Sequence, residues 1–460
     1  MLGCEEQKMK IIIVGCGQVG ETLAAELGGE GNDITVIDLS SEKINAITSR
    51  LDVMGVVGNG ATHTTLEEAG IDSADLLIAV TDSDELNLLC CIIAKRHGSC
   101  RVIARVQSPE YSTESSYLKD EIGLAMVINP EEAAAEEIAR VLRFPAANKI
   151  ETFAKGRVEL LKFRIDEESV LVGMSVKEVI TKLKCDILVC TVERDDEVHI
   201  AKGDFVFAAK DLISIIASPK SSSDFFRKIS QARHSVKDAL IIGAGKIAQY
   251  LCGILKKSGI SLKVIDKDRS LCEAFASAYE NVTVINGDET DRELLVEEGV
   301  ENADAFVVLS EYDEENIFLS LFAKSVGGGK IVTKIDKPEY DDVVQHLDID
   351  TTIYPKSITS DIIVRYVRAM KNTLGSNVET MYSFIKGVVE ATEFIVGENS
   401  PISLSPISEL KFKKDVLIAA ILRGDSVIIP RGSDVIKPGD AVVIVSKLLG
   451  LNDISDVLLR

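Results

Sequence analysis

The chain repeats itself, and this repeat constrains its fold more than any other feature. The stretch IIIVGCGQVG at residues 11–20 returns as ALIIGAGKIA at residues 239–248. Gly15 and Gly243 are 228 positions apart, and Asp75 and Asp304 are 229 positions apart. A near-constant offset over about ninety residues indicates a duplication, so one structural unit is expected twice.

Each copy alternates short Val/Ile-rich runs with amphipathic segments. KIIIVG, DITVID, VMGVVG, DLLIAV and RVIARV read as strands in the first copy, with helical patterns between them. Such alternation predicts a doubly wound parallel sheet covered by helices on both faces, that is, an α/β Rossmann-like lobe.

A smaller α+β unit of about sixty residues is expected after each lobe. The segments from Ser169 and from Ser400 share apolar strands, a charged turn and a final strand after KD or GD. The predicted organisation is an N-terminal extension at 1–8, a lobe at 9–150, a small subdomain at 151–220, a helical linker at 221–237, a second lobe at 238–375 and a second small subdomain at 376–460.

Composition excludes several function classes. With 46% hydrophobic and 27% charged residues, the chain resembles ordinary soluble globular proteins, and no apolar run reaches the 18 residues that span a bilayer. A net charge of −22 argues against binding nucleic acid. The nine cysteines lack paired spacing, which favours reduced thiols in the cytosol over disulfides or a metal site.

The first glycine turn predicts a dinucleotide site. Gly15, Gly17 and Gly20 form G-x-G-x-x-G between a strand and a helix, where Gly17 lets the backbone approach a pyrophosphate. Asp38 ends the second strand, and a carboxylate there favours NAD(H) over NADP(H). Cys16, Gln18 and Val19 complete the candidate turn. The alternative is a turn that packs without a ligand.

The second glycine turn differs from the first in several residues. Its candidate residues are Gly243, Ala244, Gly245, Lys246, Ile247 and Ala248, followed by Asp266 at the end of the next strand. Ala248 replaces the third glycine, a variant that still permits close packing. Lys246 adds a cation near the phosphates, so this site is expected to prefer a different or more highly charged nucleotide.

Other candidate residues follow later strands, whose carboxyl ends line the same crevice. They are Gly58, Asn59, Thr81, Asp82 and Arg105 in the first half and Gly287, Asp288 and Lys334 in the second. An arginine within a strand is costly to bury unless it meets an anion. A phosphate would satisfy Arg105, and so would a structural acid.

Other polar groups are read as structural. His63 and His97 have no Cys or His partner at ligand spacing, so each is interpreted as a core or surface histidine. The acidic runs PEEAAAEE and EYDEEN are interpreted as solvated helix faces, and no metal site is expected.

The sequence favours a sensor over an enzyme. A dehydrogenase needs a domain that presents substrate and a general acid or base to the nicotinamide, and the small units are too short to enclose a substrate. None of the five histidines recurs across the two halves. Duplicated nucleotide sites suit a device whose occupancy biases a conformational equilibrium in a partner. An NAD-dependent oxidoreductase with an unrecognised catalytic domain remains the alternative.

The chain resembles the TrkA family of Trk potassium-uptake regulators, which carry two RCK (KTN) domains in tandem. The resemblance rests on the two GxGxxG/A turns, on the acid after each second strand, and on the ADLLIAVTDSDE-like and IARVQSPEY-like segments. The resemblance covers Met9 to Arg460. It implies a cytoplasmic subunit, peripheral at the membrane, that assembles as a homotetrameric ring beneath a TrkH- or TrkG-like potassium-translocating membrane protein.

The resemblance also implies ligands and residues. It implies NAD(H), and ATP or ADP in some members, at Gly15–Val19, Asp38, Gly58, Asn59, Thr81 and Arg105, and in the second half at Gly243–Ile247, Asp266, Gly287, Asp288 and Lys334. Ala248 and Lys334 depart from the pattern and leave the second ligand open. An RCK regulator of another cation transporter, such as a glutathione-gated potassium efflux system, is a further alternative.

Overall fold

A computed structural model of the chain divides into two compact units. The first unit contains residues 1–139 and 237–364, and the second contains 140–236 and 365–460. The structure describes residues 8–98, 100–108, 111, 114–145, 147–153, 157–195, 197–229, 236–256, 258–337, 344, 346–347, 349–373, 378–385, 388–398, 400–403, 405–424, 426–447, 451 and 453–459.

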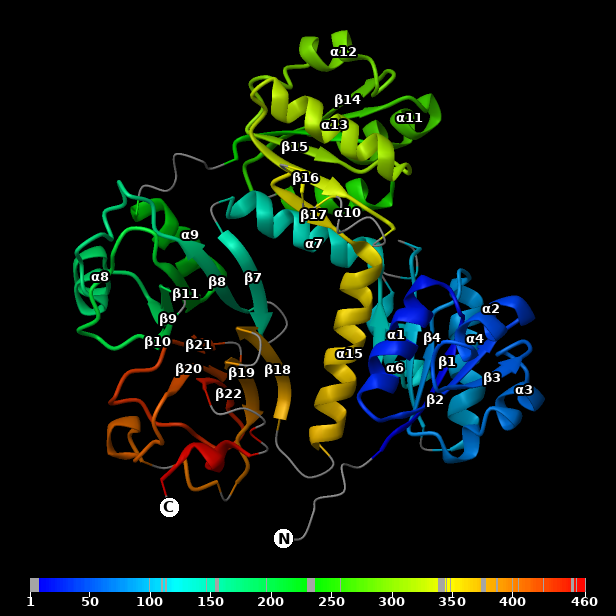
Figure 1. Ribbon diagram of the computed structural model, residues 1–460, viewed down its shortest axis with the longest axis horizontal. Helices are drawn as coiled ribbons and strands as arrows, with labels where there is room; N and C mark the ends of the chain where they lie inside the picture. Colours follow the sequence, from blue (N-terminus) through cyan, green and yellow to red (C-terminus); the bar gives the residue numbers. More distant parts are fainter. Residues whose placement is uncertain are drawn as a thin grey trace. The chain divides into compact units, whose positions relative to one another are not determined.

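The first lobe is a six-stranded parallel sheet in the order β3-β2-β1-β4-β5-β6 (blue to cyan in Figure 1). Its strands are β1 (Lys10–Val14), β2 (Asp33–Asp38), β3 (Met54–Val57), β4 (Leu76–Ala79), β5 (Arg101–Arg105) and β6 (Met126–Ile128). Its helices are α1 (Gln18–Gly29), α2 (Ser41–Thr48), α3 (His63–Glu68), α4 (Asp84–His97), α6 (Ser115–Ile122) and α7 (Pro130–Arg143), whose last residues belong to the second unit.

The second lobe repeats this topology in the order β14-β13-β12-β15-β16-β17 (green to yellow in Figure 1). Its strands are β12 (Asp238–Ile242), β13 (Ser261–Asp266), β14 (Val282–Asn286), β15 (Ala305–Val308), β16 (Lys330–Lys334) and β17 (Thr351–Ile353). Its helices are α10 (Lys246–Leu255), α11 (Arg269–Ala278), α12 (Arg292–Glu297), α13 (Asp313–Ser325) and α15 (Pro355–Thr373), which continues into the second unit. The prediction of two Rossmann-like lobes is confirmed.

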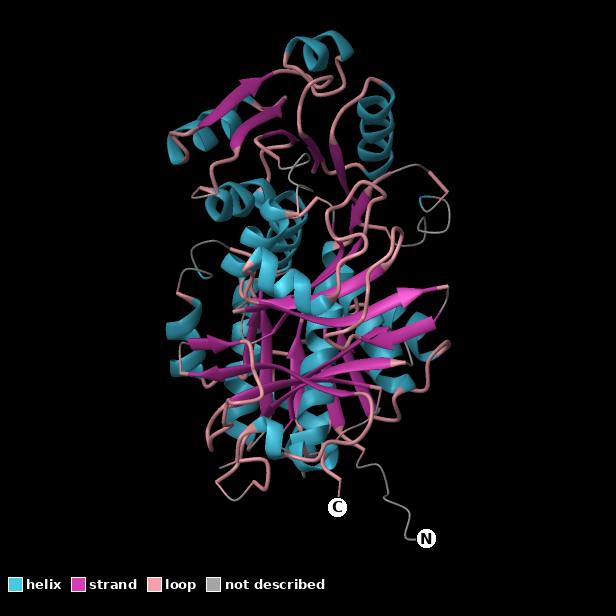
Figure 2. Cartoon of the chain, turned by 90° about the vertical axis from the view of Figure 1, so that its left-hand side faces the viewer, coloured by secondary structure: helices cyan, strands magenta, loops and turns pink. Residues whose placement is uncertain are grey.

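The second unit contains two five-stranded antiparallel sheets; Figure 2 draws their strands, like all strands of the chain, in magenta. One has the order β10-β9-β11-β8-β7, with β7 (Ala147–Phe153), β8 (Val158–Arg164), β9 (Ile187–Arg194), β10 (Glu197–Ile200), β11 (Leu212–Ala217) and helix α8 (Val176–Leu183). The other has the order β18-β19-β22-β20-β21, with β18 (Val378–Ile385), β19 (Val389–Ile395), β20 (Val416–Arg423), β21 (Ser426–Ile428) and β22 (Ala441–Ser446).

These sheets confirm the prediction of a small α+β subdomain after each lobe. An Arg–Asp pair recurs at matching places: Arg194 to Asp211 (Nη2 to Oδ2 2.6 Å) and Arg423 to Asp440 (2.7 Å). Each buried aspartate also accepts a hydrogen bond from the backbone N–H three residues upstream. The same bidentate clamp therefore ties the end of β9 to the residue before β11, and the end of β20 to the residue before β22.

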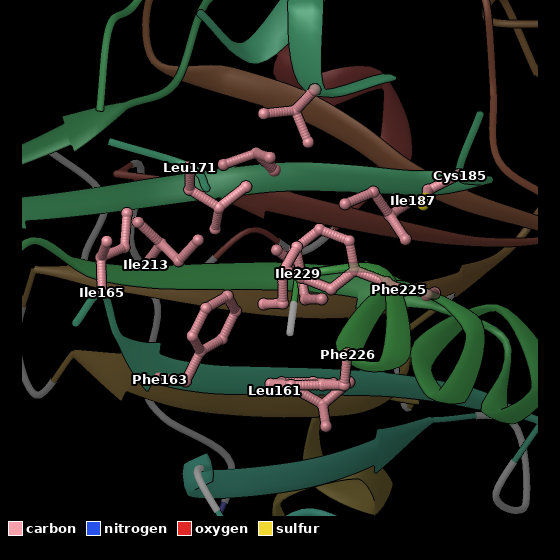
Figure 3. Close-up of a cluster of buried hydrophobic side chains, with 14 of the residues drawn as sticks. Leu161, Phe163, Ile165, Leu171, Cys185, Ile187, Ile213, Phe225, Phe226 and Ile229 are labelled. Atoms are coloured by element: carbon pink, nitrogen blue, oxygen red, sulfur yellow. The ribbon is translucent and has the colours of Figure 1, made fainter. Parts of the chain in front are cut away.

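The segment predicted as a linker, 221–237, begins inside a helix that belongs to a core. Helix α9 covers Pro219–Lys228, and Ser218 caps its first turn by accepting a hydrogen bond from the N–H of Ser221. Phe225 and Phe226 pack against Phe163 in the first small subdomain (Figure 3). The helical prediction is confirmed, but the apolar face of this helix fills the core of the subdomain. Residues 230–235 lie outside the described part of the chain.

Within the described residues, no helix is long and apolar enough to cross a membrane. The eight cysteines in the described part of the chain are buried, and no disulfide joins them.

Candidate functional site

The first candidate site lies where the connections of the first sheet diverge. Strands β1 and β4 are neighbours in the sheet although β2 and β3 separate them in the chain, and ligands of open α/β sheets bind at such a point. The turn between β1 and α1 begins at Gly15, whose φ of +105° favours glycine. The turn therefore opens toward the carboxyl ends of the strands.

The other two glycines of the motif have different structural roles. A Cβ at Gly20 would lie 1.9 Å from the carbonyl oxygen of Gly15, so Gly20 permits the helix to pack against the turn. A Cβ at Gly17 would meet no atom within 4 Å. Gly17 therefore faces open space, where the pyrophosphate of a ligand could approach the protein backbone.

A cavity of about 580 Å³ opens above this turn. The predicted residues that line it are Gly15, Gly17, Gln18, Val19, Asp38, Gly58, Asn59, Thr81, Asp82 and Arg105. Cys16 and Gly20 belong to the turn but do not line the cavity. Most of the residues predicted in the first half are thus brought together in one place.

Asp38 holds the glycine turn in position. Its Oδ2 accepts a hydrogen bond from the N–H of Cys16 at 2.8 Å, and its Oδ1 accepts one from the N–H of Ser40, also at 2.8 Å. Each oxygen keeps a free lone pair, so the carboxylate can still accept hydrogen bonds from a ribose. Burial, together with the charge of Asp38, raises the pKa of the Cys16 thiol to about 12, so this thiol stays neutral.

Arg105 is the strongest candidate for a phosphate contact. Its side chain is 13% exposed, and its Nη1 lies 3.5 Å from Oδ1 of Asp82, whose own side chain is fully exposed. Its buried Nε has no hydrogen-bond partner among the described residues. Asp82 is therefore the structural acid that the sequence left open as a partner, but its contact with Arg105 is long. The guanidinium retains donors for an anion in the cavity.

A buried asparagine positions two of these residues. Oδ1 of Asn87 accepts hydrogen bonds from the N–H and the hydroxyl of Thr81, and Nδ2 donates to the carbonyl oxygens of Thr81 and Arg105. Asn316 makes the same four bonds to Ser310 and Lys334 in the second lobe. Sequence reasoning missed this pair, although an asparagine at the same place in both copies was the available signal.

The interpretation of EYDEEN as a solvated helix face is wrong at two positions. Asp313 is 3% exposed and Asn316 is fully buried. The carboxylate of Asp313 accepts the N–H groups of Asp336 and Lys337, and that of Asp84 accepts those of Gln107 and Ser108. These side chains satisfy backbone donors that the sheet edge would otherwise leave unpaired.

The cavity also contains residues that the sequence analysis did not name. Lys43 and Lys356 bring cations to it, and the Nζ of Lys356 donates to the side-chain oxygen of Gln18. Lys356 lies more than 300 residues after the first turn, so no local pattern connects the two. Three further lining residues are Leu39, Gly60 and Leu86.

The second lobe has a cavity of about 720 Å³ at its own glycine turn. The predicted residues that line it are Ala244, Gly245, Lys246, Ile247, Ala248 and Lys334, and Arg105 lines it too. Gly243 has the expected positive φ of +96° but, like Asp266, Gly287 and Asp288, it does not line this cavity. The second site therefore matches the first at the turn and differs beyond it.

The two aspartates that do not line this cavity form hydrogen bonds with nearby residues. Asp266 accepts the N–H groups of Ala244 at 2.7 Å and Asp268 at 2.8 Å, which repeats the bonds of Asp38. Asp288 accepts from the N–H and hydroxyl of Thr290. Both carboxylates support turns in the backbone.

Lys334 also differs from its counterpart Arg105. Its side chain is 10% exposed, and its Nζ donates to Oδ2 of Asp336 at 2.5 Å and to the carbonyl oxygen of Ser310 at 3.1 Å. The ammonium is therefore already neutralised by Asp336.

The two histidines meet in the folded lobe. Nδ1 of His63 lies 2.8 Å from Nε2 of His97, and Nδ1 of His97 lies 3.3 Å from Oδ1 of Asp72. Sequence spacing gave no sign of this pair. Among the described residues, no group of three or more His, Cys, Asp or Glu side chains is arranged to hold a metal ion.

Comparison with known families matches all four parts of the chain. The TrkA-N domain family matches residues 11–130 and 239–355, and the TrkA-C domain family matches residues 160–230 and 391–458.

Full-length relatives are similar along nearly the whole chain. "Trk system potassium uptake protein TrkA homolog 1" of Methanosarcina mazei is 34% identical over 447 residues, covering 95% of this chain and 97% of that protein. "Trk system potassium uptake protein TrkA homolog" of Archaeoglobus fulgidus is 31% identical, covering 98% and 100%. "Trk system potassium uptake protein TrkA" of Haemophilus influenzae is 31% identical, covering 95% of each.

Among solved structures, the fold is similar to that of the "GsuK channel bound to NAD". The TM-score is 0.64 at 17% identity, and the match covers 96% of this chain and 77% of that one. The "GsuK RCK domain" gives a TM-score of 0.62 at 16% identity, covering 96% and 93%. At these identities the likeness shows a shared fold.

Proposed function

Because this chain belongs to the TrkA family of Trk system potassium uptake proteins, we propose that it is the nucleotide-sensing regulatory subunit of a potassium uptake system. In this proposal, NAD(H) binds the first lobe and changes its conformation. That change is passed to a TrkH- or TrkG-like membrane protein that translocates potassium. The chain acts as a regulator and performs no catalysis.

The observation that carries the proposal is the composition of the first cavity. It combines a glycine turn open to a ligand, a carboxylate at the end of β2 and a largely buried arginine whose Nε has no hydrogen-bond partner among the described residues. A pyrophosphate suits the turn and the arginine, and a ribose diol suits Asp38. ATP and ADP present the same phosphate and ribose groups and are further candidate ligands.

The family supports the proposed partner and location. The family's function in potassium uptake requires a membrane protein that carries the ion, and the described residues contain no helix suited to cross a membrane. We therefore place the chain in the cytoplasm, held at the membrane by its partner. Duplicated lobes suit a ring of copies, and a homotetramer is proposed.

Asp38→Ala tests the first site. We expect isothermal titration calorimetry to show NADH binding weakened by about 1–3 kcal/mol, because a charged hydrogen-bond acceptor is lost from the ribose and from the N–H of Cys16. Asp33→Ala removes an exposed carboxylate from the other end of β2 and is the matched control. Unchanged affinity in Asp38→Ala would show that this carboxylate does not hold the ribose. Titration of NAD, ATP and ADP against the same variants ranks the ligands.

Two further measurements separate the alternative functions. Steady consumption of NADH with candidate substrates would support an oxidoreductase, whereas binding without turnover supports a regulator. Co-purification from the native membrane identifies the partner. Recovery of an antiporter-type efflux system instead of a Trk-type protein would overturn the partner assignment.

A further inference from the structure

The two lobes differ at the end of the crevice beyond the carboxylate of Asp38 or Asp266. In the first lobe, three residues that line the cavity there are uncharged. The repeat places a charged residue at each corresponding position of the second lobe, so that Leu39, Gly60 and Leu86 correspond to Lys267, Glu289 and Glu315.

These three charged side chains form one cluster. Nζ of Lys267 lies 3.4 Å from Oε1 of Glu289, whose side chain is 5% exposed. Lys267 also lies 5.8 Å from the centre of the Tyr312 ring. Burial and the nearby charge of Glu289 raise the pKa of Glu315, while Lys267 opposes this shift. We define these three residues as the Lys267–Glu289–Glu315 cluster.

The cluster is poorly satisfied by its own protein. Oε2 of Glu289 and Oε1 of Glu315 are buried without a hydrogen-bond partner among the described residues. One ammonium faces two carboxylates, so the cluster has an excess of negative charge if all three groups are ionised. An adenine ring placed against it would remove water from these charges without pairing them, which is costly.

The shape of the second cavity agrees with this. It contains the glycine turn and Lys246, but neither Asp266 nor any member of the cluster lines it. In the first lobe, by contrast, one cavity runs from the turn past Asp38 to Leu39. Leu39 and Leu86 there offer the apolar surface that a nucleobase requires.

We infer that the two glycine turns serve unequal sites, and that the Lys267–Glu289–Glu315 cluster excludes the adenosine of NAD(H) from the second lobe. Only the first lobe then binds the dinucleotide. This inference rests on the proposed function, because it assumes that the first lobe binds NAD(H).

The test exchanges the cluster for the residues of the first lobe in the full-length chain. Calorimetry with NADH is expected to give one equivalent per wild-type chain and a second equivalent in the triple variant Lys267→Leu/Glu289→Gly/Glu315→Leu. The double variant Lys263→Leu/Glu298→Leu removes an ion pair of the same lobe that lines neither cavity. We expect it to bind one equivalent of NADH, like the wild type.

Two results would overturn the inference. One is a second equivalent of NADH already bound by the wild-type chain and lost in Asp266→Ala. The other is a folded triple variant, as judged by circular dichroism and thermal melting, that still binds one equivalent. Absence of any NADH binding to the wild-type chain would instead contradict the proposed function, so the two failures are distinguishable.

A reverse exchange keeps the test decisive if the triple variant does not fold. Leu86→Glu places a carboxylate in the first cavity, where its side chain is partly exposed. We expect NADH affinity to fall at least tenfold, while Leu89→Glu, at an exposed position of the same helix that does not line the cavity, retains it. Equal affinity in Leu86→Glu and the wild type would contradict the exclusion by charge.

Discussion

At the scale of single residues, one glycine position separates binding from folding. Gly17 and Gly20 belong to the same motif, yet a side chain at Gly17 would point into open space, and one at Gly20 would collide with the backbone at Gly15. The second lobe carries Ala248 at the position of Gly20 and still forms the same turn. The glycines of the motif therefore meet two different requirements, which are access for a ligand at Gly17 and close packing of the backbone at Gly20.

Gly17→Val and Gly20→Ala are predicted to fail in different ways. We expect Gly17→Val to abolish measurable NADH binding with a melting temperature within about 2 °C of wild type, because it blocks only the ligand. Gly20→Ala is expected to lower stability by about 1–3 kcal/mol, since a backbone contact must give way. Calorimetry and thermal melting measure the two effects, and Gly245→Val is the matched variant in the second lobe. A strongly lowered melting temperature in Gly17→Val would favour a turn that serves packing alone.

At the scale of elements, a buried asparagine ties a helix to two strand ends in each lobe. Asn87 lies in α4 and bonds the residues after β4 and at the end of β5, and Asn316 in α13 does the same for β15 and β16. Thr81 and Arg105 are candidate ligand contacts, so this bond network sets the geometry of the first cavity. Asn87 thus acts on the site although it does not itself line the cavity.

Asn316→Ala is predicted to destabilise the second lobe by about 2–3 kcal/mol, because it leaves buried hydroxyl and carbonyl groups unpaired. Differential scanning calorimetry measures the effect as a lower melting temperature. Glu314→Ala, an exposed change in the same helix turn, is expected to melt near the wild type. Equal melting temperatures for the two variants would show that the network contributes little.

At the scale of the whole molecule, buried thiols link stability to alkaline pH. Burial raises the pKa values of Cys90 and Cys252 from 9.0 to about 12, and that of Cys100 to about 11. Between pH 9 and 11 the unfolded chain loses these protons and the folded chain retains them. Stability contributed by the neutral thiols is therefore present below pH 9 and lost as the pH rises.

The double variant Cys90→Ala/Cys252→Ala is predicted to show a shallower fall in melting temperature between pH 8.5 and 10.5 than the wild type. Lysines and tyrosines titrate in both proteins, so the difference in slope reports the two thiols. Parallel curves would show that these thiols ionise equally in the folded and unfolded chains.

The two lobes, the glycine turns and most of the first site can be predicted from the sequence. The spacing of Gly15, Gly17, Gly20 and Asp38 is local, and strand and turn geometry fix where such residues lie. The first cavity gathers most of the predicted residues because the carboxyl ends of parallel strands meet at one edge.

The difference between the two halves, by contrast, depends on the folded arrangement of the chain. Lys267, Glu289 and Glu315 lie far apart in the sequence and look like ordinary surface charges there, but the fold brings them together and buries one carboxylate oxygen of each glutamate. The same holds for Lys356 beside Gln18 and for Phe225 in its core. Repeats and local motifs survive in the letters of a chain, whereas burial and the pairing of charges depend on contacts between distant residues, which exist only once the chain has folded.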